Sequence, residues 1–405
     1  MTELRGRLVC GVIFAAVCVL AGCSSTVHGA GEAAEVDVRT FDTGRFPTTG
    51  PKLSSALDYR DYVGLEAARM ADAVRNPHEV DAKYALGATA SAHTDPGSVA
   101  RYLYDSTIPV LRKYGMVVGF SSAAADTEVP PEKALYEISG QQREGLTVTV
   151  TRFPDESTAK AAAVELDAVD LAVNPENVAV KLPKYPQAAA HWRPSLPTLG
   201  STTAHGIFVV SVYAVTRNPD LNVLIAITQK YLDAEMSALD AFSPTPTREI
   251  TTLQQDSDRM LTRTIYDNGK VGRPDGNSNV VYTTRGYLNY VLDQAGRSRA
   301  LGNAGVDRVA VGQLAYLFRA RDELAAKQWV KESAELGEPA DRRDVDPPAE
   351  VPDAVCIEDR FTTAATRFRC FVSYRRYGAL ILGTRLWETQ QRAAAQYALL
   401  ANTQG

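Results

Sequence analysis

Residues 146–153, Leu-Thr-Val-Thr-Val-Thr-Arg-Phe, alternate apolar and polar side chains with a period of two. Because successive side chains of a β-strand point to opposite faces of a sheet, this period predicts a half-buried strand with one apolar and one polar face. Pro154-Asp155-Glu156 then begins a helix that is predicted to reach about Leu171. Its acidic residues lie in the first turn, where the helix dipole favours negative charge. The strand and the helix together predict a sheet that is covered by helices.

The elements around this unit follow a similar order in both halves of the chain. Each half is predicted to contain a helix, a strand, a helix with an acidic first turn, a long irregular insert, a strand and a helix. In the first half we predict helices at 57–74, from 96, at 154–171 and at 218–242, strands at 134–139, 146–153 and 206–216, and the insert at 174–203. In the second half we predict helices at 283–294, 322–336 and 386–401, strands at 309–318, 368–374 and 377–382, and the insert at 337–354.

The repeated order predicts an α+β fold. It consists of two related α/β sandwich-like units, each an antiparallel sheet covered by helices, and a ferredoxin-like arrangement is one form that such units take. The segment Ser-Pro-Thr-Pro-Thr at 243–247 is typical of a linker. We therefore predict an N-terminal α+β domain at 53–243 and a C-terminal α+β domain, with one disulfide, at 244–405.

The first residues have the pattern of a secretory signal peptide. Arg5 and Arg7 precede an apolar run at 8–20, which is shorter than the roughly 20 residues that a membrane-spanning helix needs. Leu-Ala-Gly-Cys at 20–23 resembles the lipobox of bacterial lipoproteins. That resemblance implies cleavage before Cys23, diacylglycerol on its sulfur, and acylation of the new amino terminus with a chain such as palmitate. An ordinary secretory signal with an incidental cysteine is the alternative.

The residues after Cys23 are rich in Ser, Thr, Gly and Ala as far as residue 50, which is typical of a flexible tether. We therefore assign 1–22 to the signal peptide and 23–52 to the lipidated cysteine and its tether. The expected location is the extracytoplasmic face of the cell membrane. The expected membrane contact is the lipid on Cys23.

Two cysteines remain once the signal and the anchor are set aside, Cys356 and Cys370. In an exported protein an even pair predicts a disulfide, and no histidine or Cys-x-x-Cys spacing nearby indicates a metal site. Removing residues 1–22 takes away Arg5, Arg7 and Glu3, which changes the formal net charge from −5 to −6. This mild acidity gives no electrostatic footprint for nucleic acid.

The chain resembles a family of secreted lipoproteins from mycobacteria and related actinobacteria that has no assigned activity. The resemblance rests on the signal that ends at Cys23, on the paired late cysteines, and on three stretches. These stretches are Leu-Asp-Tyr-Arg-Asp-Tyr at 57–62, Glu-Ala-Ala-Arg-Met-Ala at 66–71, and Gln-Arg-Ala-Ala-Ala-Gln-Tyr-Ala-Leu-Leu at 391–400. It covers nearly the whole mature chain. It implies location and architecture, and no catalytic residues.

The insert at 174–203 is the best place to look for a binding site. Long irregular loops in compact domains are often functional. This insert carries polar and aromatic side chains, and His205 follows it directly before the next predicted strand. The candidate ligand-binding residues are Tyr185, His191, Trp192, Arg193 and His205. The favoured interpretation of the insert is a proline-pinned cover over the core, with a binding site as the alternative.

The sequence contains no motif that assigns catalysis. It lacks the G-x-S-x-G elbow, the H-E-x-x-H zinc motif, the P-loop and a G-x-G-x-x-G loop in the right context. A serine–histidine pair of Ser195 or Ser201 with His191 or His205 is the one generic alternative. Four arginines near Cys370 favour a solvated face over an anion site: Arg367, Arg369, Arg375 and Arg376. We predict no cofactor and no metal.

Three functional hypotheses remain. The leading one is a non-enzymatic lipoprotein of the cell envelope. It would bind a small or lipidic ligand or an envelope partner protein. The second is an envelope hydrolase that uses the region from His191 to His205. The third is a purely structural component of an envelope assembly.

Overall fold

The computed structural model describes residues 36–54, 56–130, 133, 143–336, 342–359 and 366–403. The signal peptide, Cys23 and the strand predicted at 134–139 lie outside these residues. Residues 38–405 make one compact unit.

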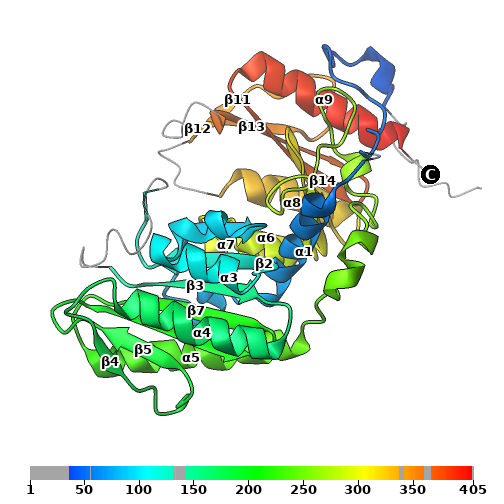
Figure 1. The fold of residues 1–405 in the computed structure, drawn as a ribbon. Coiled ribbons are helices and arrows are strands. Elements are labelled where there is room, and N and C mark those ends of the chain that lie inside the picture. The colour runs from blue at the N-terminus through cyan, green and yellow to red at the C-terminus, as the bar shows by residue number, and fades with distance from the viewer. Residues whose placement is uncertain are drawn as a thin grey trace, which may run out of the picture. The chain divides into compact units, whose positions relative to one another are not determined.

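The first half forms a seven-stranded antiparallel sheet with strand order β1-β2-β3-β7-β6-β5-β4 (Figure 1). Its strands are β1 (Leu86–His93), β2 (Val118–Ala125), β3 (Gly145–Arg152), β4 (Val178–Val180), β5 (Ala189–Trp192), β6 (Thr198–His205) and β7 (Phe208–Val215). Its main helices are α1 (Tyr59–Ala73), α2 (Pro77–Val80), α3 (Ile108–Lys113), α4 (Glu156–Leu171) and α5 (Leu221–Ala241), with short 3-10 turns η2 (Pro96–Arg101) and η3 (Asp105–Thr107).

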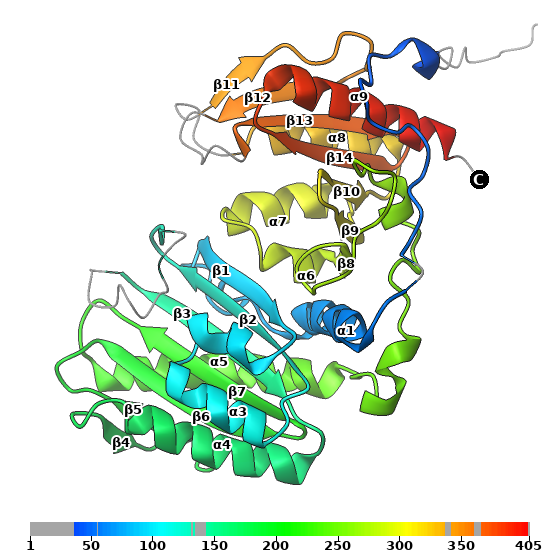
Figure 2. The same cartoon turned by 45° about the horizontal axis from the view of Figure 1, so that its top comes forward.

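The second half forms another seven-stranded antiparallel sheet, with strand order β11-β12-β13-β14-β10-β9-β8 (Figure 2). Its strands are β8 (Val280–Thr283), β9 (Arg308–Val311), β10 (Ala315–Arg319), β11 (Arg342–Val345), β12 (Val355–Asp359), β13 (Phe368–Tyr374) and β14 (Tyr377–Gly383). Its helices are α6 (Thr284–Leu288), α7 (Gln294–Asn303), α8 (Glu323–Ala334) and α9 (Leu386–Asn402).

The two halves share one topology. When the second order is written from its other edge, β8-β9-β10-β14-β13-β12-β11, each strand takes the place of its counterpart in the first sheet. A helix follows the third strand in both halves, α4 and α8, and another follows the seventh, α5 and α9. The predicted fold class, two related α+β units with antiparallel sheets and helices, is confirmed. The connectivity is a three-stranded meander, a helix, a four-stranded meander and a helix, which is not the β-α-β-β-α-β order of ferredoxin-like units.

Helices cover both faces of the first sheet. Along β7, Phe208, Val210 and Val212 belong to the apolar cluster that includes residues of α5. Val209, between them, belongs to a separate cluster with Ala159 of α4 and with residues of α3. Successive side chains of β7 therefore pack into two different apolar clusters, one on the face covered by α5 and one on the face covered by α4.

The sequence missed several strands. The insert at 174–203, predicted to be irregular, contains β4, β5 and the start of β6, and the insert at 337–354 contains β11. The single strand predicted at 309–318 is the hairpin β9–β10, and the helix predicted at 283–294 is the short α6 with a break before α7. Strands β1, β2, β8 and β12 were not predicted. Strand β2, Val-Gly-Phe-Ser-Ser-Ala-Ala-Ala, shows the reason, because small residues have low strand propensity and pairing on both sides decides its structure.

The chain before α1 also differs from the expected tether. Phe41 and Phe46 are buried in the apolar cluster that contains residues of α9. Asn402 donates a hydrogen bond from Nδ2 to the carbonyl oxygen of Thr48 at 3.0 Å. Residues 41–52 therefore pack against the C-terminal half, although their composition had suggested flexibility. Two buried phenylalanines decide the outcome over the surrounding Gly and Thr.

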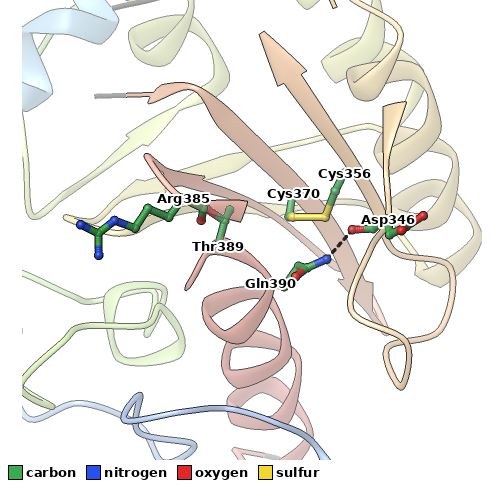
Figure 3. The surroundings of a disulfide bond; sticks show 6 residues. All are labelled: Asp346, Cys356, Cys370, Arg385, Thr389 and Gln390. Atoms are coloured by element: carbon green, nitrogen blue, oxygen red, sulfur yellow. Dashed lines mark hydrogen bonds between the residues drawn. A yellow bond between two sulfur atoms is a disulfide. The ribbon is translucent and has the colours of Figure 1, made fainter. Parts of the chain in front are cut away.

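The expected disulfide joins Cys356 of β12 to Cys370 of β13, which are directly paired in the sheet. Figure 3 shows the bond beside the start of α9, where Gln390 Nε2 donates to the carbonyl oxygen of Asp346 at 2.6 Å. Both cysteines are buried in the cluster shared with α9. In the described part of the chain, no helix combines the length and the apolar character that crossing a bilayer requires.

Candidate functional site

The face of the first sheet beneath α4 is lined with small and hydroxyl-bearing side chains. Residues that pair directly across strands share a face, and one such row is Ser121, Thr149, Ser211 and Thr202. The next row is Thr147, Tyr213, Gly200 and His191. Strand β3 was predicted to be half-buried, with the threonines on its polar face, but this face is buried too, because α3 and α4 cover it (Figure 2).

Two adjoining cavities lie on this face. The larger measures about 250 Å³ and the smaller about 30 Å³, and a single water needs roughly 10–15 Å³ by the same measure. Four residues line both cavities: Tyr104, Asp170, Gly200 and Tyr213. The larger cavity opens toward the β5–β6 connection, and the smaller one reaches into the row of hydroxyl groups. We refer to the two together as the α4 cavity.

His191 is the central titratable group of the α4 cavity. Its side chain is about nine-tenths buried, with Nδ1 3.7 Å from Asp167 Oδ1 and Nε2 3.7 Å from Asp170 Oδ2. These separations exceed hydrogen-bond length, and Nδ1 is buried without a hydrogen-bond partner in the described structure. Gly200 makes room for the ring, because a Cβ there would lie 3.2 Å from Cε1 and Nε2 of His191. The ring thus has unused hydrogen-bonding capacity.

Burial controls the electrostatics of the α4 cavity. It raises the pKa of the Asp170 carboxyl, an effect that His191 opposes and Asp167 reinforces. Burial also raises the pKa of the Tyr104 hydroxyl, and the charge of Asp170 adds to that effect. Hydrogen bonds to a ligand would be strong here because water competes poorly in such surroundings.

A series of hydrogen-bonded polar side chains continues along the same face. His93 Nε2 lies 2.7 Å from Ser121 Oγ, which lies 2.8 Å from Thr149 Oγ1. Burial lowers the pKa of His93 to about 4, so its ring is neutral at pH 7. Nearby, Thr89 Oγ1 donates to the hydroxyl of Tyr102 at 2.6 Å. The hydroxyl groups beneath α3 and α4 are therefore ordered by one another.

The structure divides the five candidate residues of the sequence. His191, Trp192 and Arg193 line the larger cavity. Tyr185 and His205 lie instead against α5, where the Tyr185 hydroxyl donates to Asp233 Oδ1 at 2.6 Å and His205 Nε2 lies 2.7 Å from Asp240 Oδ1. Neither of these two lines the α4 cavity.

The serine–histidine alternative finds no support in the geometry. Ser201 pairs with Ala190 and Val212, so its side chain belongs to the α5 face, whereas His191 belongs to the α4 face. His205 shares the α5 face with Ser201, but it lies four residues further along β6, about 13 Å at a rise of roughly 3.3 Å per residue, and its Nε2 lies 2.7 Å from Asp240 Oδ1. Among the described residues, no group of three or more His, Cys, Asp or Glu side chains is arranged to hold a metal ion.

The arginines near Cys370 are engaged in ion pairs along the sheet. Arg367 Nη2 lies 2.5 Å from Glu358 Oε1, and Arg369 pairs with Asp359 on the neighbouring strand. These cross-strand pairs account for two of the four arginines. They favour the structural interpretation of this group.

Sequence reasoning missed most of the cavity wall. The lining hydroxyl groups come from strands far apart in the chain, Thr149 from β3, Thr202 from β6 and Ser211 from β7. The Thr-x-Thr-x-Thr alternation of β3 was the one available signal, and it was interpreted as the polar face of a half-buried strand. A buried hydroxyl face has the same sequence pattern as an exposed one, so only the covering helices distinguish the two.

Comparisons with known proteins extend over nearly the whole described body. Residues 55–255 match the model described as "Domain of unknown function (DUF7373) N-terminal", and residues 260–403 match "Domain of unknown function (DUF7373) C-terminal". A search of curated proteins gave no match. Among solved structures, the extracellular domain of PknH from Mycobacterium tuberculosis is similar at a TM-score of 0.29 and 14% identity, covering 41% of this chain and 93% of that chain.

Proposed function

We propose that this chain, which belongs to the DUF7373 family over both the N-terminal and the C-terminal domain, is a non-enzymatic binding protein of the cell envelope. In this proposal the α4 cavity captures a small ligand. The body is tethered by a lipid on Cys23 at the outer face of the cytoplasmic membrane, as in the actinobacterial lipoproteins that its sequence resembles.

One observation carries the binding proposal. The α4 cavity is concave, is bounded by aromatic side chains, and contains converging polar groups, of which His191 Nδ1 is buried and unpaired. Buried polar groups in folded proteins are nearly always hydrogen-bonded. Ligand sites characteristically combine such a cavity with a few placed polar groups. A bound ligand would satisfy the ring and use space that side chains leave open.

Native mass spectrometry tests the binding proposal. The disulfide-bonded body, residues 24–405, would be exported from an actinobacterial host and sprayed under non-denaturing conditions. We expect a reproducible extra mass that is lost on denaturation and is reduced in His191→Ala. The matched control is His205→Ala, which removes the histidine that lies against α5. An added mass that is equal in both variants would assign the ligand to another place, and bare protein in every preparation would contradict capture of a ligand from the envelope.

The anchor is tested separately. The full chain should partition with membranes, and Cys23→Ser should release it, because two or more acyl chains are needed for stable anchoring. The matched control is Cys18→Ser, which changes a cysteine inside the apolar run. Membrane retention of Cys23→Ser, with no lipid mass on the wild-type amino terminus, would contradict lipidation.

A further inference from the structure

The shared topology allows the two halves to be aligned residue by residue without sequence identity. In the first half His205 pairs with Phe208 across a two-residue turn, and in the second half Tyr374 pairs with Tyr377 in the same way. The first residues of both turns, Gly206 and Arg375, have positive φ. These matched turns fix the register of β6–β7 on β13–β14.

The third strands and the following helices have the same register. Arg152 pairs with Phe208, and Arg319 pairs with Tyr377. Three residues later, Asp155 caps α4 by accepting from the amide of Thr158, as Asp322 caps α8 by accepting from the amide of Ala325, each at 2.8 Å. The alignment therefore extends from the strands into the helices above them.

This alignment shows that the hydroxyl groups of the α4 cavity replace large apolar side chains of the second half. Thr202 takes the place of Phe371, Ser211 that of Leu380, and Thr149 that of Tyr316. In the second half Phe371 packs beneath Trp329 of α8, with ring centroids 6.1 Å apart. On the helix, Ala162 of α4 occupies the position of Trp329 in α8. On the strand, Val209 occupies the position of Gly378 and fills part of the volume that the Trp329 side chain takes up in the second half.

The space between the sheet and the helix after its third strand is thus filled by apolar side chains in the second half, and it is partly empty and lined by hydroxyl groups in the first half. Protein interiors pack to crystal density with few voids. Cavities that persist with polar walls hold water or a ligand, whereas empty ones are apolar. The α5 face of the first sheet differs less from its counterpart, because Val148, Val210 and Val212 keep it apolar within the cluster that both halves share, although Thr203 stands there in place of Val372.

The chemistry of the wall selects the ligand. Thr149, Thr202 and Ser211 each both donate and accept hydrogen bonds, and Asp170 offers a carboxylate that can accept from two neighbouring hydroxyl groups. Tyr104 and Tyr213 line both cavities and contribute aromatic surface to the wall. The guanidinium of Arg193, which lies 3.7 Å from Glu176, is balanced by that carboxylate and by the acids of α4. The wall therefore favours a neutral ligand with many hydroxyl groups over an anion or an acyl chain.

We infer that the α4 cavity binds a neutral sugar ring in its larger part, beside Asp170, with a hydroxyl or hydroxymethyl group directed into the smaller part toward Thr149, Thr202 and Ser211. This inference rests on the proposed function, and it adds the class of the ligand. The second half is the filled counterpart of the site, and it contributes stability in place of binding.

The test uses the body of the protein, residues 24–405, with its disulfide intact. The probes are glucose, mannose, galactose and arabinose, with methyl glycosides of each, and inorganic phosphate serves as the charged probe. Binding is followed by saturation-transfer NMR and by titration of the tryptophan fluorescence, since Trp192 borders the cavity. We expect saturable binding of at least one neutral sugar and none of phosphate.

Three variants locate the binding. Ser211→Leu installs the residue of the second half and should weaken sugar binding at least tenfold, and Asp170→Asn, which keeps the shape, should weaken it severalfold. Thr203→Val makes the equivalent exchange on the α5 face, since Val372 is its counterpart, and it should leave binding unchanged. Thermal unfolding of each variant checks the fold. If Ser211→Leu does not fold, the location of the site is decided by whether Asp170→Asn weakens sugar binding.

The outcomes separate the inference from the proposed function. Sugar binding that Thr203→Val weakens as much as Ser211→Leu would overturn the assignment to this cavity. If no neutral sugar binds but a different native mass is expelled by Ser211→Leu, the sugar class is wrong and ligand capture stands. If no sugar binds and no native mass depends on the cavity, both are wrong.

Discussion

At the scale of single residues, the structure contains a carboxyl group, that of Glu235, whose burial disfavours its ionised form. Glu235 of α5 accepts from the amide of Arg75 at 2.8 Å and from the hydroxyl of Tyr231 at 3.0 Å, while its other oxygen, Oε1, is buried without a partner. Burial raises the pKa of the Glu235 carboxyl to about 7. An unpaired buried charge is costly, so this group opposes folding when it is ionised.

The sign of the pH effect follows from that shift. The folded pKa lies above the unfolded one, so the folded state binds the proton more tightly. The penalty is fully present above pH 7 and disappears as the pH falls toward 4.5. We expect Glu235→Gln to raise the free energy of unfolding by roughly 1–3 kcal/mol at pH 8 and to change it little at pH 4.5.

Urea denaturation at pH 4.5, 6, 7 and 8 measures this difference. Comparing Glu235→Gln with wild type at each pH cancels the contribution of His93, whose lowered pKa acts in the opposite direction. Glu388→Gln is the control, a partly exposed carboxyl that pairs with Arg392 within α9. A difference between wild type and Glu235→Gln that does not depend on pH would contradict the assignment.

At the scale of elements, a buried ionic network joins α1, β3 and the linker between the halves. Glu66, which is fully buried, accepts from Arg152 Nη1 at 2.9 Å and from the amide and hydroxyl of Thr245 at 2.8 Å each. Arg69 adds a further hydrogen bond at 2.6 Å. The Pro-rich segment that was predicted as a linker is therefore held by Glu66 together with Arg69 and Arg152, which donate to the carbonyl oxygens of Ser243 and Thr245.

Removing that carboxylate should be among the most damaging single changes in the chain. Glu66→Ala leaves the guanidinium of Arg152 buried without its partner, and breaking such a pair costs about 3–5 kcal/mol. We expect a correspondingly lower urea midpoint, and a smaller loss for Glu66→Gln, which retains an acceptor. The double variant Glu66→Ala/Arg152→Met removes both charges and should recover part of the loss. Equal stability of Glu66→Ala and wild type would contradict the role assigned to the network.

The predictability of elements followed the strength of their local signals. The helices at 57–74 and 386–401 were predicted close to their observed bounds, since they combine helical periodicity with good helix formers. Strands β1 and β2 were missed because Ala, Ser and Gly carry little strand preference. The Cys356–Cys370 disulfide was predictable from count and context alone.

At the scale of the whole molecule, the two halves share one core. Helix α1 belongs to the first half by sequence, yet it packs on β8 and α6. Asp72 accepts from the amide of Gly286 at 2.9 Å, and Asn289 Nδ2 donates to the carbonyl oxygen of Ala71 at 3.1 Å. A single apolar cluster contains residues of both halves.

This shared core predicts that the N-terminal half does not fold alone. A fragment of residues 53–243 would expose the side of α1 that normally contacts α6, and it would also lack Thr245, the partner of Glu66. We expect the fragment to unfold without a cooperative transition and to be cleaved rapidly by protease, whereas residues 36–405 should melt in one transition. Circular dichroism and limited proteolysis compare the two. A cooperative melt of the fragment would contradict this prediction and establish 53–243 as an independent domain.

The sequence by itself determined the features whose signals lie within a few adjacent residues. These are the strongly periodic helices and the repeated α+β order of the chain, whereas the signal and lipobox expected at 1–23 stay a prediction. Only the tertiary structure decided which polar face is buried, since an alternating strand looks the same whether water or a helix covers it. It also decided which side chains meet, because pairing across the sheet brings Thr149, Gly200 and His191 to one face and places His205 on the other. Tyr185, which lies outside the strands, donates to Asp233 of α5. Strand register and helix cover arise from contacts between distant residues, and no local pattern records them.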